Sequence, residues 1–276
     1  MSFSFNEITE NEVNKTLVVD ALNLAFRYKH QGRTDFRHEY VATVESFAKS
    51  YKCEKIIITA DQGSSEYRQY ILPTYKANRK EKYDTQSEEE KLYFKQFFLE
   101  YENTLSLLEE QFVVLRCPKV EADDLAAYLV KYKSKFNIGD MVLLSSDRDW
   151  DLLVQDGVMR FSYVTRKEVT VENWHDHYEV SREQYACFKC LTGDKGDNVP
   201  GFTGVGPKRA VELLRQYESA YNIYDNIPLD GHYKYLQEIN SNPERILRNY
   251  ELMDLLTHCD DAIGALNVQE INRRMQ

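Results

Sequence analysis

The stretch Thr-Leu-Val-Val-Asp-Ala-Leu-Asn at residues 16–23 decides the fold, because it reads as a short buried strand that ends on an acid. Two similar runs are Lys-Ile-Ile-Ile-Thr-Ala-Asp at 55–61 and Met-Val-Leu-Leu-Ser at 141–145, and Phe-Val-Val-Leu-Arg at 112–116 is a fourth candidate. Such runs lack polar alternation, which is typical of parallel strands covered on both faces. Helical patterns separate them, so the sequence predicts an α/β fold with a mostly parallel central sheet and helices on both faces.

An insertion of about residues 62–111 interrupts this pattern. In it, Ser87 and Glu90 form a capping box, which predicts a helix that begins there. After residue 191 the chain is glycine-rich and then helical to its end. We therefore expect two domains, an α/β domain at 1–180 that carries the insertion, and a helical region at 181–276.

Length and charge limit the possible functions. The chain has 276 residues, 42% of them hydrophobic, which is ample for a sizeable core. No apolar run approaches the ~18 residues of a membrane span, and residues 1–15 lack a signal-peptide pattern, so we expect a cytoplasmic protein without a membrane partner. The formal net charge of −10 is unusual for a nucleic-acid enzyme, but the segment 66–82 carries five basic and two acidic residues. Local charge decides such binding, and DNA is not excluded.

Acids recur where the predicted strands end. Asp20 ends the first strand and Asp61 the second, while Asp147 and Asp149 follow the third in Ser-Ser-Asp-Arg-Asp-Trp-Asp. Ligand sites of open parallel sheets form outside the carboxyl ends of the strands. We expect these side chains to converge on one crevice.

Two further motifs add acids to this set. Glu121, Asp123 and Asp124 begin a helical pattern, and Asp194 and Asp197 lie in Gly-Asp-Lys-Gly-Asp-Asn at 193–198. Alone, the first is an ordinary acidic helix start and the second an ordinary turn. Nine acids in one crevice would repel and raise each other's pKa values, and Mg²⁺ or Mn²⁺ suits all-oxygen ligands. Two such ions about 4 Å apart would favour phosphodiester hydrolysis.

The sequence Gly-Val-Gly-Pro-Lys-Arg at 204–209 precedes an apolar helical pattern. Gly204 and Gly206 would let the backbone approach a phosphate, and a helix that begins at Pro207 would present free N–H groups to it. Lys208 and Arg209 add positive charge. This pattern indicates a helix–hairpin–helix motif that binds the DNA backbone without reading its sequence.

Together these motifs resemble the 5′-nuclease (flap endonuclease) family of bacteriophages and of the N-terminal domains of bacterial DNA polymerase I. The resemblance covers nearly the whole chain. It rests on Asp20 with Asn23, Asp61, Tyr-Lys-Ala-Asn-Arg at 75–79, and the acidic and glycine motifs described above. It implies a structure-specific 5′-3′ exonuclease and flap endonuclease that hydrolyses DNA at 5′ ends, flaps or nicks by two-metal-ion catalysis.

The resemblance also implies roles for individual residues. The first metal would be held by Asp20, Asp61, Glu121, Asp123 and Asp124, and the second by Asp147, Asp149, Asp194 and Asp197, with some acids acting through water.

The DNA contacts are implied in the same way. Lys76 and Arg79 would point at the scissile phosphate, Tyr75 would stack on an unpaired base, and Arg27 would lie near the duplex. Residues 80–111 would form an arch around a single-stranded 5′ end. The resemblance further implies K⁺ at the glycine-rich hairpin and a monomer as the acting form.

Three other readings of the acidic pattern remain open. Asp-x-Asp at strand ends also occurs in aspartyl-phosphate phosphatases, which would form a covalent phospho-enzyme. A non-catalytic DNA-junction-binding member of the same fold would have lost several acids. A PIN-like ribonuclease would share the acidic core but lack the arch and the hairpin.

Overall fold

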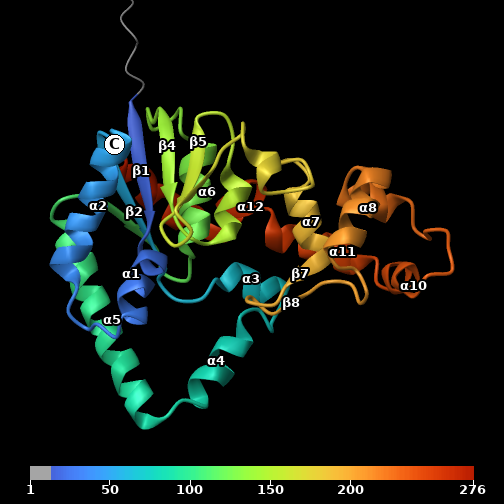
Figure 1. Ribbon diagram of the computed structural model, residues 1–276, viewed down its shortest axis with the longest axis horizontal. Helices are drawn as coiled ribbons and strands as arrows, with labels where there is room; N and C mark the ends of the chain where they lie inside the picture. Colours follow the sequence, from blue (N-terminus) through green and yellow to red (C-terminus); the bar gives the residue numbers. More distant parts are fainter. Residues whose placement is uncertain (1–13) are drawn as a thin grey trace, which may run out of the picture.

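The computed structural model describes residues 14–276 and contains a six-stranded sheet with strand order β3-β2-β1-β4-β5-β6 (Figure 1). The strands are β1 (Lys15–Asp20), β2 (Lys55–Ala60), β3 (Val113–Arg116), β4 (Asp140–Leu144), β5 (Val158–Ser162) and β6 (Lys167–Val169). β1 to β5 run parallel, and β6 pairs antiparallel with β5 at the edge. The predicted mostly parallel sheet is confirmed. Of residues 1–15, in which we expect no signal peptide, residues 1–13 lie outside the described residues.

All four strands expected from the sequence are present, while β5 and β6 were not expected. β5 reads Val-Met-Arg-Phe-Ser, and its central arginine, Arg160, is only 5% exposed. Because a charged residue interrupts this short apolar run, the hydrophobic pattern did not predict a strand here.

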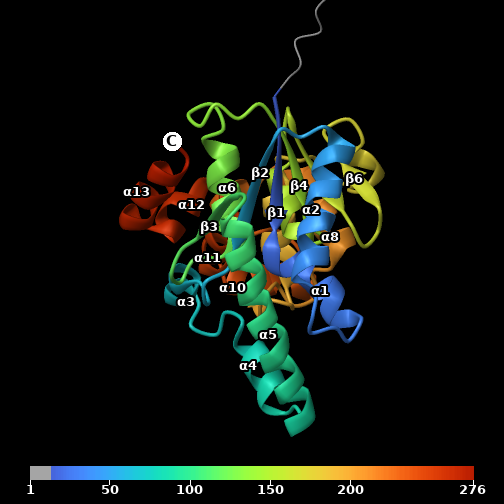
Figure 2. The same cartoon turned by 90° about the vertical axis from the view of Figure 1, so that its left-hand side faces the viewer.

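Helices cover both faces of the sheet (Figure 2). One face carries α1 (Ala21–His30), α2 (Arg37–Tyr51) and α5 (Glu88–Glu109), which pack with Leu17, Val19 and Ile58 of the sheet. The other face carries α6 (Ala122–Lys131), α12 (Leu255–Ile263) and α13 (Ala265–Arg274), which pack with Val18 and Ile57. Alternate residues of one strand thus enter two separate cores, which explains the continuous apolar runs.

A separate core holds the helical region together. It contains Trp174, Leu191 and Ile246, and it joins the 3-10 turn η2 (Trp174–Asp176) to the helices that follow. These helices are α7 (Tyr185–Thr192), α8 (Pro207–Tyr217), α9 (Ala220–Asp225), α10 (Lys234–Ser241) and α11 (Glu244–Met253). Because α12 and α13 return to the sheet, the region expected at 181–276 is divided between two cores.

The insertion projects away from the sheet as two helices that meet at a tight turn (Figure 1). It contains the short helix α3 (Glu66–Ile71), then α4 (Ala77–Asp84), and then the long helix α5. The capping box predicted at Ser87 and Glu90 is present, with hydrogen bonds of 2.8 and 3.2 Å. From Phe97 onward α5 packs on the core, through Phe97, Tyr101 and Leu105. Within residues 14–276, no helix has the length and hydropathy required to cross a membrane.

Candidate metal centre

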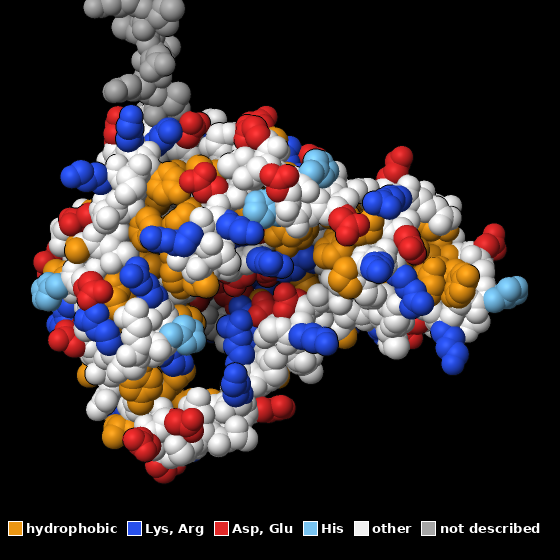
Figure 3. Space-filling view, viewed as in Figure 1, with side chains coloured by type: hydrophobic (Ala, Val, Ile, Leu, Met, Phe, Trp, Pro, Cys, Tyr) orange, Lys and Arg blue, Asp and Glu red, His pale blue; other side chains and the backbone are white. Residues whose placement is uncertain are grey.

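Acidic side chains gather in a hollow bordered by lysines and arginines (Figure 3). Asp20 is the last residue of β1, and Asp61 directly follows β2. After β4 the chain enters the 3-10 turn η1 (Arg148–Leu153), where the carboxylate of Asp147 accepts a hydrogen bond of 3.0 Å from the backbone N–H of Asp149. The parallel strands therefore deliver these acids to one edge of the sheet, as the sequence predicts.

Two further elements bring acids to the same edge. Glu121 and Asp123 lie at the start of α6, and Asp194 and Asp197 come from the hairpin formed by β7 (Gly193–Asp194) and β8 (Val199–Pro200). The backbone N–H of Lys76 donates to the carbonyl of Asp197 at 2.9 Å. The hairpin of the helical region is thus fastened to the start of α4.

Four of the acids have raised pKa values. One of them, Asp149, pairs with Lys189, and we call the other three, Asp20, Asp61 and Asp123, the high-pKa acids. Burial and the charge of Asp61 raise the pKa of Asp20 to about 8, although the Ser145 hydroxyl donates to it at 2.7 Å. Burial raises the pKa of Asp61, and burial together with the charge of Asp147 raises that of Asp123 well above its ordinary value. Each of these carboxylates would be stabilised by added positive charge.

Other acids are held by basic side chains, and we call Glu121, Asp124, Asp194 and Asp197 the ion-paired acids. Lys76, at the start of α4, lies 2.7 Å from Glu121 and 3.6 Å from Asp197. Arg79, one turn further along α4, lies 2.7 Å from Asp197. Burial alone would raise the pKa of Glu121, but the nearby positive charges outweigh it and lower that pKa.

Lys189 is a residue of this site that the sequence analysis missed. It lies on α7, is 7% exposed, and bridges Asp149 and Asp194, with its Nζ 3.3 Å from the latter. Burial and repulsion still raise the pKa of Asp149, to about 6, despite this lysine. The one available signal was a single lysine within the apolar run Ala-Cys-Phe-Lys-Cys-Leu at 186–191.

Asp124 departs from the ligand set that the resemblance implied. Both of its carboxylate oxygens accept hydrogen bonds from Arg68, at 2.6 and 2.7 Å, and both side chains are buried. Such a bidentate pair occupies the oxygens that a metal would need. Asp124 therefore anchors α3 to α6 and contacts no open part of the hollow.

Tyr75 also differs from its expected role. It is 4% exposed, and its hydroxyl donates to Glu121 at 3.0 Å and to Asp197 at 2.9 Å. A base needs an open ring face for stacking, and this ring is packed against the protein. In this structure Tyr75 links α6 to the β7–β8 hairpin.

A buried network that the sequence analysis also missed supports the turn η1. Arg160 of β5 pairs with Asp151, whose carboxylate also accepts from the hydroxyl of Tyr178. Arg160 further donates to the carbonyl of Ser145 at 3.1 Å. Asp151, the last acid of the run at 147–151, is thus an internal counterion that holds the segment carrying Asp147 in place.

The glycine-rich segment 201–206 precedes α8 as expected. Gly204 has a φ of +81°, and a side chain there would approach Arg209 and Tyr235. Gly206 has open space where a Cβ would lie, and Lys208 is exposed. The backbone of this hairpin is therefore accessible to a ligand. Arg27 lies in the last turn of α1, with its guanidinium 6.0 Å from the centre of the Tyr28 ring.

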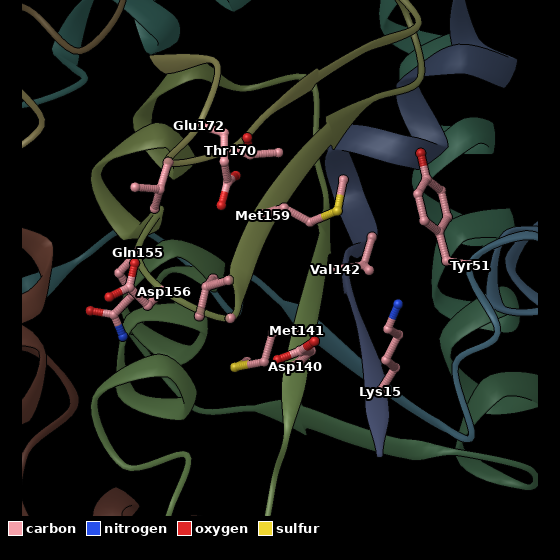
Figure 4. Close-up of a pocket in the computed structure, with 13 residues that line it drawn as sticks. Lys15, Tyr51, Asp140, Met141, Val142, Gln155, Asp156, Met159, Thr170 and Glu172 are labelled. Carbon is pink, nitrogen blue, oxygen red and sulfur yellow. The ribbon is translucent and has the colours of Figure 1, made fainter. Parts of the chain in front are cut away.

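A cleft of about 670 Å³ joins the acids to the arch. Asp61 and Glu121 line it together with Lys76, Arg79 and Arg116. A different pocket, of about 250 Å³, lies at the opposite ends of the strands, where Figure 4 shows Lys15 and Asp140. None of the site residues expected from the sequence lines that second pocket.

The donor chemistry of the hollow fits divalent metal ions. Mg²⁺ and Mn²⁺ prefer oxygen ligands. The high-pKa acids supply such oxygens, and their pKa values are raised because the positive charges near them do not offset burial and repulsion. Among the described side chains of residues 14–276, no three His, Cys, Asp or Glu groups already surround one metal-sized point.

Two models of one protein family and a phage relative each match this chain, and together they cover nearly all of it. Residues 15–182 match the family model described as the 5′-3′ exonuclease N-terminal resolvase-like domain, and residues 180–274 match that of the 5′-3′ exonuclease C-terminal SAM fold. The flap endonuclease of Escherichia phage T5 is 39% identical over 99% of this chain and 96% of its own. A thermostable DNA polymerase I of Thermus caldophilus is 31% identical over 77% of this chain but only 25% of its own length.

Solved structures of the phage T5 enzyme are also similar. A structure of the T5 5′-exonuclease with bound divalent zinc has a TM-score of 0.91 and 38% identity, covering 95% of this chain and 98% of that one. A pseudo-enzyme-product complex of the T5 flap endonuclease with DNA and metal ions has the same TM-score, identity and coverage.

Proposed function

Since this chain belongs to the 5′-3′ exonuclease family, which includes flap endonucleases, we propose that it binds two Mg²⁺ or Mn²⁺ ions at the acidic hollow and hydrolyses DNA at 5′ ends, flaps and nicks. Its activity is that of a metal-dependent 5′-3′ exonuclease and flap endonuclease. The observation that carries the proposal is the gathering of the high-pKa acids, with Asp20 and Asp61 at the carboxyl ends of β1 and β2 and Asp123 at the start of α6.

We propose the metal ligands that the resemblance implies, with Asp124 left out. Asp20, Asp61, Glu121 and Asp123 would hold the first ion, and Asp147, Asp149, Asp194 and Asp197 the second. Bound ions would activate water and stabilise the leaving oxygen of a phosphodiester. Asp124 is omitted because Arg68 engages both of its oxygens.

The basic side chains of α4 are suited to hold the phosphate. Lys76 and Arg79 line the cleft, and each is held there by an acid of the hollow. A fixed cation beside the transferring phosphate stabilises the charge that develops in the transition state. We propose both as catalytic residues, with Lys76 closer to the reacting phosphate because its ammonium contacts Glu121.

The remaining DNA contacts extend away from the hollow. We propose that the arch formed by α4 and α5 surrounds a single-stranded 5′ end, and that Arg27, Gly204, Gly206, Lys208 and Arg209 contact the duplex. K⁺ at the hairpin carbonyls, action as a monomer, and a location in the cytoplasm of a bacterial host belong to the same proposal. The first two come from the resemblance, and the phage source of the T5 relative supports the location.

Cleavage of a 5′-labelled flap duplex tests the proposal. We expect cutting near the junction with Mg²⁺, no cutting with EDTA, and no cutting by the double variant Asp147→Asn with Asp149→Asn. Asp140→Asn, at the other end of β4, is the matched control and should cut normally.

Two outcomes would contradict the proposal. Shape-selective DNA binding without cleavage would indicate a non-catalytic junction-binding protein. Preferential cutting of an RNA version of the same flap would indicate a PIN-like ribonuclease.

A further inference from the structure

A pair of stacked tyrosines lies at the start of α10, far along the chain from the acidic hollow. The rings of Tyr233 and Tyr235 have centroids 5.7 Å apart and an interplanar angle of 21°. Tyr233 is 66% exposed, whereas Tyr235 is partly buried against the core of the helical region. The outer ring therefore presents a large apolar face and a hydroxyl to solvent.

The tyrosine pair adjoins the glycine-rich hairpin. A Cβ at Gly204 would lie 3.4 Å from the Cβ of Tyr235. The guanidinium of Arg209 lies 4.7 Å from the centre of the Tyr235 ring and donates to the carbonyl of Gly204. Arg209 and Tyr235 thus join two segments that are distant in sequence into one surface.

The charge of this surface favours an anionic partner. Residues 204–209 and 231–235 together contain the basic residues Lys208, Arg209 and Lys234 and no acid, in a chain with a formal net charge of −10. Asp230 is the acid that directly precedes the second segment. At this end of the molecule Figure 3 shows basic and apolar side chains with acidic ones interspersed. A polyanion bound at the glycine-rich hairpin would extend over Tyr233 and Tyr235.

We propose that Tyr233, supported by Tyr235, contacts the sugar-phosphate backbone of duplex DNA next to the hairpin. The inference rests on the proposed function, and it adds a contact of a different kind. The ring packs against deoxyribose, and the hydroxyl donates to a phosphate oxygen. Because tyrosine carries no charge, this contact neutralises no phosphate and releases no counterions, unlike a lysine–phosphate contact.

Equilibrium binding to a flap duplex in EDTA, measured over a series of salt concentrations, tests this contact. We expect Tyr233→Ala to weaken binding roughly three- to tenfold at every salt concentration, as expected for one uncharged hydrogen bond with its packing, and to leave the salt slope unchanged. Lys208→Ala should instead reduce that slope by about one. Tyr233→Phe should retain part of the affinity, and binding to single-stranded DNA should be unchanged.

Tyr221→Ala is the matched control, because Tyr221 is 49% exposed on α9 and packs against Tyr250. Equal affinities of wild type and Tyr233→Ala, or an equal loss in Tyr221→Ala, would overturn the inference. Melting temperatures identify any variant that loses affinity through unfolding. If the wild type cleaves the flap with metal and Tyr233→Ala binds DNA as tightly as the wild type, only this contact is refuted. If the wild type does not cleave the flap, the proposed function itself is refuted.

Discussion

The high-pKa acids share the hollow with three of the ion-paired acids, Glu121, Asp194 and Asp197, but differ from them in how their charge is balanced. Asp20 and Asp61 are hydrogen-bonded to Ser145 and to the backbone of Ala122, and burial still raises their pKa values. Glu121, almost equally buried, has a lowered pKa because Lys76 contacts it directly. Hydrogen bonds alone therefore do not balance the buried charges of Asp20 and Asp61, whereas the adjacent ammonium of Lys76 outweighs burial at Glu121. Bound metal ions should therefore stabilise the high-pKa acids more than the ion-paired acids.

Replacing a high-pKa acid should have the largest effect, and it should change activity and stability in opposite directions. Asp20→Asn should reduce single-turnover cleavage by roughly 10³-fold or more, since a lost metal contact costs several kcal/mol in the transition state. In EDTA at pH 8 the same variant should melt at a higher temperature than wild type, because it lacks a charge that Asp61 repels. Cleavage at the wild-type rate would exclude Asp20 from the metal centre.

Removing Arg68, the counterion of Asp124, should mainly affect stability. Arg68→Met leaves Asp124 buried without its partner and should lower the free energy of unfolding by about 3–5 kcal/mol, measured by urea denaturation in EDTA. Lys119→Met breaks an exposed pair with Glu66 and should cost at most about 1 kcal/mol. Similar small losses in both variants would show that the buried pair is not a structural anchor.

Lys76 should show a smaller effect that separates turnover from binding. Lys76→Ala should lower kcat roughly 10²-fold or more, since it removes a cation expected beside the reacting phosphate. DNA affinity should stay within a few-fold of wild type, because the hairpin and the arch retain their contacts. Parallel losses of kcat and affinity would assign Lys76 to simple phosphate binding.

Strand-end patterns predicted most of the fold and most of the acidic hollow. The runs at 16–20, 55–61 and 141–145 form adjacent parallel strands, and the acids that follow them lie together. Spacing could not predict which acids are ion-paired, because Arg68 lies 56 residues from Asp124 and Lys189 lies 40 residues from Asp149 along the chain. Tyr75 was misjudged for the same reason, since its burial depends on the β7–β8 hairpin, more than 100 residues away.

The pH dependence of stability, with and without metal, is the most direct test of the proposed metal site. Asp20, with a pKa of about 8, and Asp149, at about 6, hold protons in the folded protein that the unfolded chain releases near pH 3.8. Between these values the folded state binds more protons, so stability must fall as pH rises. In EDTA we predict a melting temperature that falls steadily from pH 5 to pH 8, and a Mg²⁺ or Mn²⁺ stabilisation that grows over the same range. A melting temperature that rises or stays level in EDTA, with no gain from metal, would contradict the account.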